Sequence, residues 1–163
     1  MLIFSHLMID YHNCLKKQTT EGNESENKRS ANGVGGIMDI NTLRMIWEKG
    51  KVVEGVDPAM FRKDACDAWI AWDKFGVQDN LYGWEIDHIC PKSRLEQRGF
   101  KDEAIDDLRN LRPMQHENNA SKGDDYPSYT AVVTSDGRKN IHKENNLTVN
   151  AVTRRIIDEL FPK

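Results

Sequence analysis

The sequence predicts a small α+β protein, because segments with helical spacing of apolar residues alternate with segments that have strand-like alternation. The clearest helix covers 149–161, whose apolar residues recur every three or four positions. The clearest hairpin joins 129–134 to 139–142 through Asp136-Gly137, a residue pair typical of tight turns. With 163 residues and no internal repeat, the chain has room for one compact domain and a tail.

The N-terminal part differs from the rest in composition. Residues 16–36 are polar, rich in Gly, Asn, Ser and Glu, and nearly free of large apolar side chains. Such a segment buries too little surface to offset the entropy lost on ordering. We therefore predict a disordered segment over 1–37 and a single domain over 38–163. Since Met38 opens the first segment with helical character, translation from Met38 rather than Met1 stays an open alternative.

Several classes of protein are excluded by simple counts. No apolar run approaches the roughly 20 residues of a membrane helix. The apolar N-terminus lacks the basic start and small-residue cleavage site of a signal peptide. The three cysteines, Cys14, Cys66 and Cys90, show no paired spacing and predict neither a disulfide framework nor a thiolate zinc site. We expect a reducing, cytoplasmic setting, with Cys66 and Cys90 buried as small apolar residues.

The formal net charge of -3 argues against tight, non-specific coating of nucleic acid, which normally requires a basic surface. It does not exclude a nuclease, because a bound divalent metal supplies positive charge where the phosphate reacts.

The first half of the domain is predicted in three pieces. Residues 39–49 have helical spacing, with Asp39 or Asn41 available as a cap and Gly50 as a stop. Over 61–76 helical spacing and strand alternation fit equally, so periodicity leaves this segment open. Residues 81–89 are predicted as a strand.

The centre of the chain continues with short elements. We predict a loop over 91–99, an acidic helix over 101–109, a second strand over 111–114 interrupted by Pro113, and a helix over 116–122.

The chemistry lies in the first central strand, where Asp87 and His88 are adjacent. A carboxylate is a natural ligand for a hard divalent cation. An imidazole titrates near neutrality and is a natural general base. An Asp-His pair alone is common, so its neighbours decide the interpretation.

Those neighbours form a pattern: Asp-His on a strand, Asn-Leu opening a second strand, and Asn-x-x-Lys on a helix. The matching residues are Trp84, Asp87, His88, Pro91, Asn110, Leu111, Pro113, Asn119 and Lys122. As a set they resemble the HNH endonuclease family over 84–125. The resemblance implies a ββα-metal core, here with flanking helices and a C-terminal hairpin.

The resemblance also implies a role for each residue. His88 would be the general base, and Asn110 would hold the loop backbone or His88 in place. Asp87 and Asn119 would hold one divalent metal. Asn119 stands where many relatives have His, and an amide oxygen is also a hard ligand. The neighbouring Asn118 stays an alternative ligand, although the Asn-x-x-Lys spacing favours Asn119.

The implied cofactor is Mg²⁺, with Mn²⁺ as a substitute, and no structural zinc is expected because the cysteine pairs of many relatives are absent. Packing of Trp69, Trp72 and Trp84 would hold the fold instead. DNA is the implied partner, with Arg94 and Lys122 as candidate contacts.

The expected function is hydrolysis of DNA phosphodiester bonds, by nicking or double-strand cleavage, to a 5′-phosphate and a 3′-hydroxyl. Two alternatives stay open: a catalytically silent nucleic-acid-binding or assembly module, as in a phage or mobile element, and a nuclease that acts on RNA. Target sequence and oligomeric state are not predicted.

Overall fold

The computed structural model describes residues 39–163, so the predictions of disorder over 1–37 and of a start at Met38 lie outside the described residues. The described part is mixed, with short helices and small antiparallel two-stranded sheets. The α+β class predicted from sequence is confirmed. None of the helices in this part is long and apolar enough to cross a membrane.

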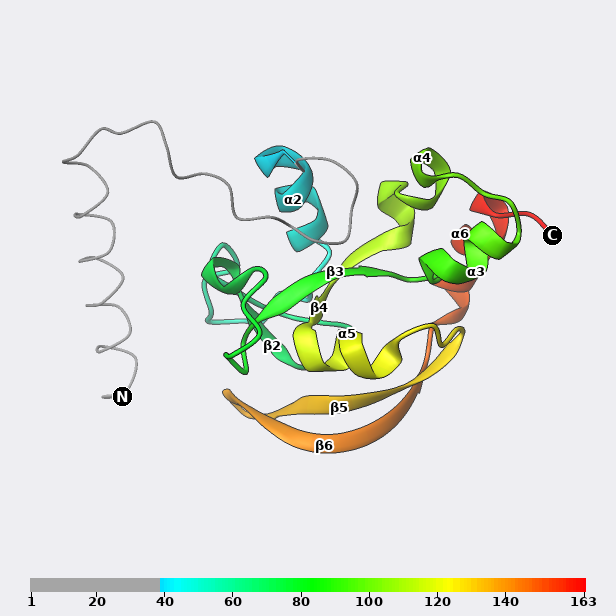
Figure 1. Ribbon diagram of the computed structural model, residues 1–163. Helices are drawn as coiled ribbons and strands as arrows, with labels where there is room; N and C mark the ends of the chain where they lie inside the picture. The colour runs from blue at the N-terminus through cyan, green and yellow to red at the C-terminus, as the bar shows by residue number, and fades with distance from the viewer. Residues whose placement is uncertain (1–38) are drawn as a thin grey trace. The chain divides into compact units, whose positions relative to one another are not determined.

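A strand pair and a helix form the centre (Figure 1). Strand β3 covers Trp84–His88 and pairs antiparallel with β4, Leu111–Gln115. Helix α5, His116–Lys122, follows β4 directly and begins at the residue predicted. Pro113 is tolerated within β4 opposite Ile86, because in this two-stranded sheet the missing N–H interrupts no third strand.

One side of the β3–β4 hairpin is apolar and is covered by α2, Ile40–Trp47. Of the two caps that the sequence offers, Asp39 is the one used: it accepts bonds from the Asn41 and Thr42 amides. The Trp47 and Trp84 rings lie 5.2 Å apart and form an aromatic cluster with Trp72 and Phe75. Tryptophan packing thus supports the hairpin from this side.

The other side of the hairpin faces α5, which lies between it and a second hairpin (Figure 1). That hairpin joins β5, Ser128–Asp136, to β6, Lys139–Thr148, with a register shift between Ala131 and Val133. The turn at Asp136-Gly137 is confirmed, and both strands are longer than predicted.

The connection from β3 to β4 is folded. It contains α3, Lys92–Gln97, α4, Asp102–Ile105, and the 3-10 turn η2, Leu108–Asn110. The prediction of a loop over 91–99 was wrong, because Pro91 opens a helix and buried Leu95 anchors it. The single helix predicted over 101–109 divides into α4 and η2.

The ambiguous segment 61–76 is neither one helix nor one strand. It is a hairpin of β1, Phe61–Lys63, and β2, Trp69–Ala71, followed by the 3-10 turn η1, Trp72–Lys74. The buried Asp64 carboxylate organises the turn by accepting bonds from the Cys66 and Ala68 amides. This local capping was not visible in the apolar periodicity.

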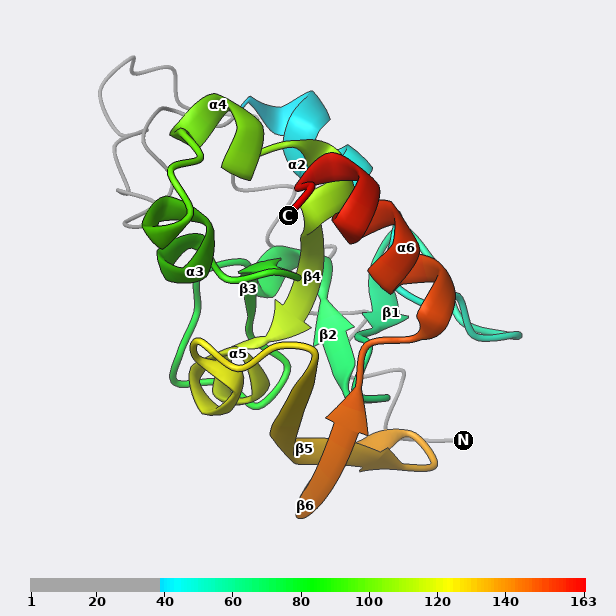
Figure 2. The same cartoon turned by 90° about the vertical axis from the view of Figure 1, so that its right-hand side faces the viewer.

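Helix α6, Ala151–Leu160, closes the domain, on the opposite side of β4 from α3 (Figure 2). Its Ile157 joins the larger core cluster, which includes Leu95, Ile105 and Met114. Cys66 and Cys90 are free and buried, as predicted, and burial raises the pKa of the Cys66 thiol to about 12. Both thiols therefore act as core residues.

Candidate functional site

Asp87 is buried, and two cations neutralise it. Its Oδ1 lies 2.8 Å from Lys122 Nζ, and its Oδ2 accepts a bond of 2.7 Å from Arg112 Nε. The register places Arg112 directly opposite Asp87, so both side chains lie on the α5 side of the hairpin. Removal of three charges from water is costly, so this arrangement depends on all three remaining together.

Lys122 differs in position from a surface DNA contact. It is 2% exposed, and besides Asp87 it bonds the His88 carbonyl at 2.9 Å. A side chain buried in this way does not make a direct contact with a phosphate at the surface. Lys122 instead joins α5 to the end of β3.

Arg94 is exposed on α3. Its guanidinium bonds the Asp124 and Tyr126 carbonyls at 2.6 and 3.0 Å, which joins α3 to the segment after α5. It stays a candidate phosphate contact at the surface, although part of its donor capacity is used within the protein.

A second polar contact lies beside Asp87 on the same face of β3. Glu85 precedes Asp87 by two residues, and its Oε2 accepts a bond of 2.8 Å from Asn119 Nδ2. Its Oε1 accepts from Gln78 at 2.6 Å. Glu85 and Asn119 are half-buried. The pair thus forms a more open edge of the site than Asp87.

Asn118 is not available as a ligand in this structure. It is fully buried, and its oxygen accepts bonds from the Val132 and Val133 amides. Its nitrogen donates to Asp64 at 3.1 Å and to the Val133 carbonyl at 2.8 Å. Asn118 therefore holds α5 against β5, whereas the half-buried Asn119 contacts β3 through Glu85.

Asp64 completes this buried anchor. Its Oδ2 also accepts from the Gln115 amide at 3.0 Å, at the junction of β4 and α5. Burial raises the pKa of Asp64, and the bonds from Gln115, Asn118, Ala68 and Cys66 oppose that rise.

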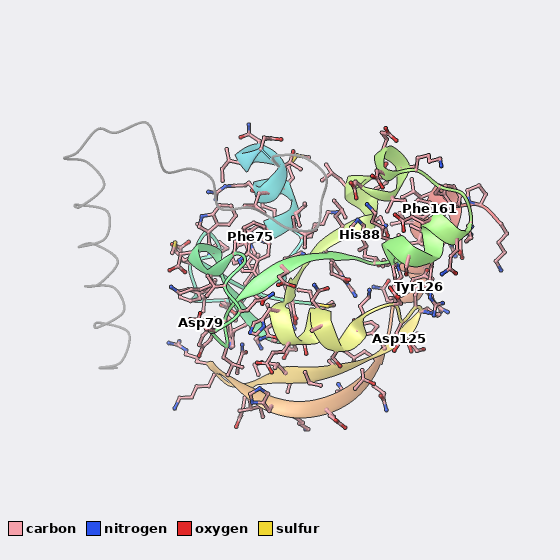
Figure 3. The ribbon with its side chains drawn as sticks, in the orientation of Figure 1. Phe75, Asp79, His88, Asp125, Tyr126 and Phe161 are labelled. Atoms are coloured by element: carbon pink, nitrogen blue, oxygen red, sulfur yellow. The ribbon has the colours of Figure 1, made fainter. Side chains whose placement is uncertain are left out.

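His88 ends β3 on the opposite side from Asp87, where α4 lies (Figure 3). Its Nε2 lies 2.8 Å from Asp106 Oδ1, just after α4. The two side chains are 13% and 23% exposed, so the pair is partly shielded from solvent. Among residues 39–163 no other side chain bonds the ring, so Asp106 is the side-chain partner of His88 in the described part of the chain.

Asn110 is buried and bonds the loop backbone rather than His88. Its oxygen accepts from the Cys90 amide at 2.9 Å, and its nitrogen donates to the Cys90 and Ile105 carbonyls. Of the two roles that the sequence left open, the structure thus places Asn110 in the first. It clips together the two ends of the connection between β3 and β4.

The oxygen donors fit a hard divalent ion in their chemistry: Glu85 and Asp87 offer carboxylates, and Asn119 offers an amide oxygen. An ion bound at Asp87 would compete with Lys122 and Arg112, which bond one carboxylate oxygen each. Within the described residues no three His, Cys, Asp or Glu side chains gather as a metal-binding group. Phosphate and water oxygens would therefore complete the shell, as is usual for Mg²⁺.

Sequence reasoning missed Glu85 and Asp106, and it did not predict that Arg112 pairs with Asp87. Glu85 had a detectable signal, because on a strand it shares a face with Asp87. Asp106 and Arg112 had none, since their contacts depend on the path of the connection and on the strand register.

No family model matches the chain, and neither a curated protein nor a solved structure matches it.

Proposed function

We propose that the protein is a metal-dependent endonuclease of the HNH type that hydrolyses DNA phosphodiester bonds. One observation carries the proposal: β3, β4 and α5 form a strand–strand–helix unit in which the Asp87 side of β3 faces the helix that bears Asn119. This is the arrangement that the resemblance implies for a ββα-metal core.

His88 is the general base in this proposal. Because Asp106 bonds Nε2, Nδ1 is the atom that takes a proton from the attacking water. Asn110 holds the connection on which Asp106 lies, and the reaction leaves a 5′-phosphate and a 3′-hydroxyl.

Asp87 and Asn119 are the proposed holders of Mg²⁺, or of Mn²⁺ in its place, with Glu85 beside them. A bound divalent ion supplies charge stabilisation for the pentavalent phosphate and the departing oxygen. Arg94 is the proposed surface contact to the DNA backbone. Lys122 instead keeps the site folded by neutralising Asp87.

Plasmid nicking tests the proposal. Supercoiled DNA with Mg²⁺ or Mn²⁺ should convert to the open circle, and EDTA should stop the conversion. His88→Ala should lower the rate by about 10²–10⁴-fold, the usual contribution of a positioned general base. His142→Ala is a matched control, because His142 is an exposed imidazole on β6. Full activity of His88→Ala would overturn the assigned role.

A second candidate is a nucleic-acid-binding module without turnover. Two observations favour it. The ion pairs with Arg112 and Lys122 occupy the Asp87 carboxylate, and the net charge of -3 leaves no general excess of cations for catalysis on phosphate. Salt-dependent affinity for labelled DNA without cleavage at any metal concentration would support it. The same cleavage assays with RNA as the substrate distinguish a nuclease that prefers RNA from one that prefers DNA.

A further inference from the structure

We propose that Asp106 is a positioning residue for His88: it fixes the imidazole proton on Nε2 and thereby keeps the lone pair on Nδ1. The catalytic role of this contact rests on the proposed function. The contact itself is independent of that function, because it is a short bond between two partly buried side chains.

The chemistry follows from the two groups. An ionised carboxylate only accepts hydrogen bonds, so the ring nitrogen that faces it must carry a proton. A neutral imidazole has one such proton, and its other nitrogen then holds the lone pair. When Nδ1 takes a proton from water, the ring becomes cationic, and Asp106 lies 2.8 Å away to stabilise that charge.

The His88 end of the contact is fixed by the strand. His88 pairs with Leu111 in the β3–β4 register, and its carbonyl accepts the bond from Lys122. The ring therefore projects from a backbone that is held on two sides.

The Asp106 end is fixed by the clip that Asn110 makes. Asn110 Nδ2 donates to the carbonyl of Ile105, the residue just before Asp106, at 3.0 Å. The Asp106 amide also bonds the Asp102 carbonyl at 2.8 Å and closes the turn of α4. This gives Asn110 a route to the base that involves no contact with the imidazole.

A neighbouring carboxylate on α4 already has a cationic partner. Asp102, on the same helical turn, forms an ion pair with Lys92 at 2.8 Å. Asp106 is thus the acid that His88 meets, and Asp102 provides a matched control. It is an aspartate of α4 that has its own cationic partner.

The first test needs no catalysis. In ¹⁵N-histidine spectra of the full chain at a pH where the ring is neutral, His88, assigned by its loss in His88→Gln, should show a protected Nε2-bound proton and a bare Nδ1. Asp106→Ala should lose that protected proton signal, whereas Asp102→Ala should keep it. A wild-type ring protonated on Nδ1, or a signal unchanged in Asp106→Ala, would refute the contact.

The second test places the contact in the reaction. In nicking assays Asp106→Ala should lower kcat by about 10–100-fold with little change in KM, as is typical when the outer partner that orients a histidine is removed. Asp106→Glu should recover part of the loss, and Asp102→Ala should keep wild-type activity. In a His88→Ala background, Asp106→Ala should cost nothing further, because its effect acts through the ring. An equal additional loss would show that Asp106 serves only the fold.

The two tests distinguish a failure of the proposed nuclease function from a failure of the Asp106–His88 contact. If the wild-type chain nicks no DNA under any condition, the proposed nuclease is refuted and the catalytic part of this inference with it. The spectra then still decide whether Asp106 fixes the proton of His88.

Discussion

The two sides of the β3–β4 hairpin are stabilised by different kinds of interaction. On the α2 side Trp84 packs against Trp47 in an aromatic cluster. On the α5 side Asp87 is held by Arg112 and Lys122. Both sides are buried, yet one is joined by contacts between aromatic rings and the other by ion pairs between one carboxylate and two cations.

The two sides should differ in how they tolerate substitutions. Aromatic packing tolerates small changes in its neighbours, because it depends on contact area rather than on single partners. A buried ion cluster depends on every member, since the loss of one leaves a charge without compensation. Substitutions on the two sides of this hairpin should therefore differ in their cost to stability.

The largest expected effect comes from breaking the charged side. Lys122→Ala should lower the free energy of unfolding by about 3–5 kcal/mol, because Asp87 loses a partner inside the protein and the His88 carbonyl loses its donor. Urea denaturation followed by tryptophan fluorescence measures it. Lys143→Ala, at an exposed position on β6, should change stability by no more than about 0.5 kcal/mol. Equal effects of the two variants would remove the contrast between buried and surface lysines.

The neighbouring asparagines should separate stability from activity. Asn118→Ala should cost about 2–4 kcal/mol in unfolding, because two β5 amides and Asp64 lose their partner. Asn119→Ala should cost about 1 kcal/mol or less and should abolish or weaken metal-dependent nicking. Paired denaturation and nicking measurements check both. A stable Asn118→Ala protein without activity would reverse the assignment.

A smaller effect is expected on the aromatic side. Trp47 Nε1 donates to the Pro58 carbonyl at 3.1 Å, whereas buried Trp84 Nε1 has no hydrogen-bond partner among the described residues. Trp47→Phe should therefore cost about 1 kcal/mol more than Trp84→Phe, since only the first substitution removes a bond. Thermal or urea unfolding of the two variants measures the difference. Equal costs would mean that volume alone governs this side.

The smallest effect concerns acid stability. Asp107 caps η2 and bonds the Arg109 side chain, which lowers the pKa of Asp107 to about 2. A depressed pKa stabilises the folded state above the ordinary value, and that stability is lost as the pH falls from about 4 towards about 2. Asp107→Asn should flatten this part of the stability curve by less than about 1 kcal/mol, because its partner Arg109 is exposed and solvent screens the pair. Denaturation at several acidic pH values, against wild type, gives the test.

The sequence predicted best what neighbours along the chain decide. Helix α5 and the Asp136-Gly137 turn follow from local pattern and turn chemistry. The segment that became β1 and β2 could not be predicted from periodicity, because Asp64 bends it through bonds to its own turn and to β4 and α5.

The candidate site follows the same rule. Asp87, His88 and Asn119 carry a recognisable spacing, but their actual partners come from other elements. Asp106 reaches His88 only through the folding of α4, and Arg112 meets Asp87 only through strand register. Contacts set by three-dimensional packing leave little trace in a single sequence.

The clip formed by Asn110 has a consequence for engineering. It fastens the connection between β3 and β4 at its base, through Cys90 and Ile105, while Gly99 within the connection is exposed and adopts a positive φ of 89°. Chain length added at an exposed position costs little when the base is held. Gly99 is therefore the natural place to graft a recognition peptide or a fluorescent tag without disturbing β3.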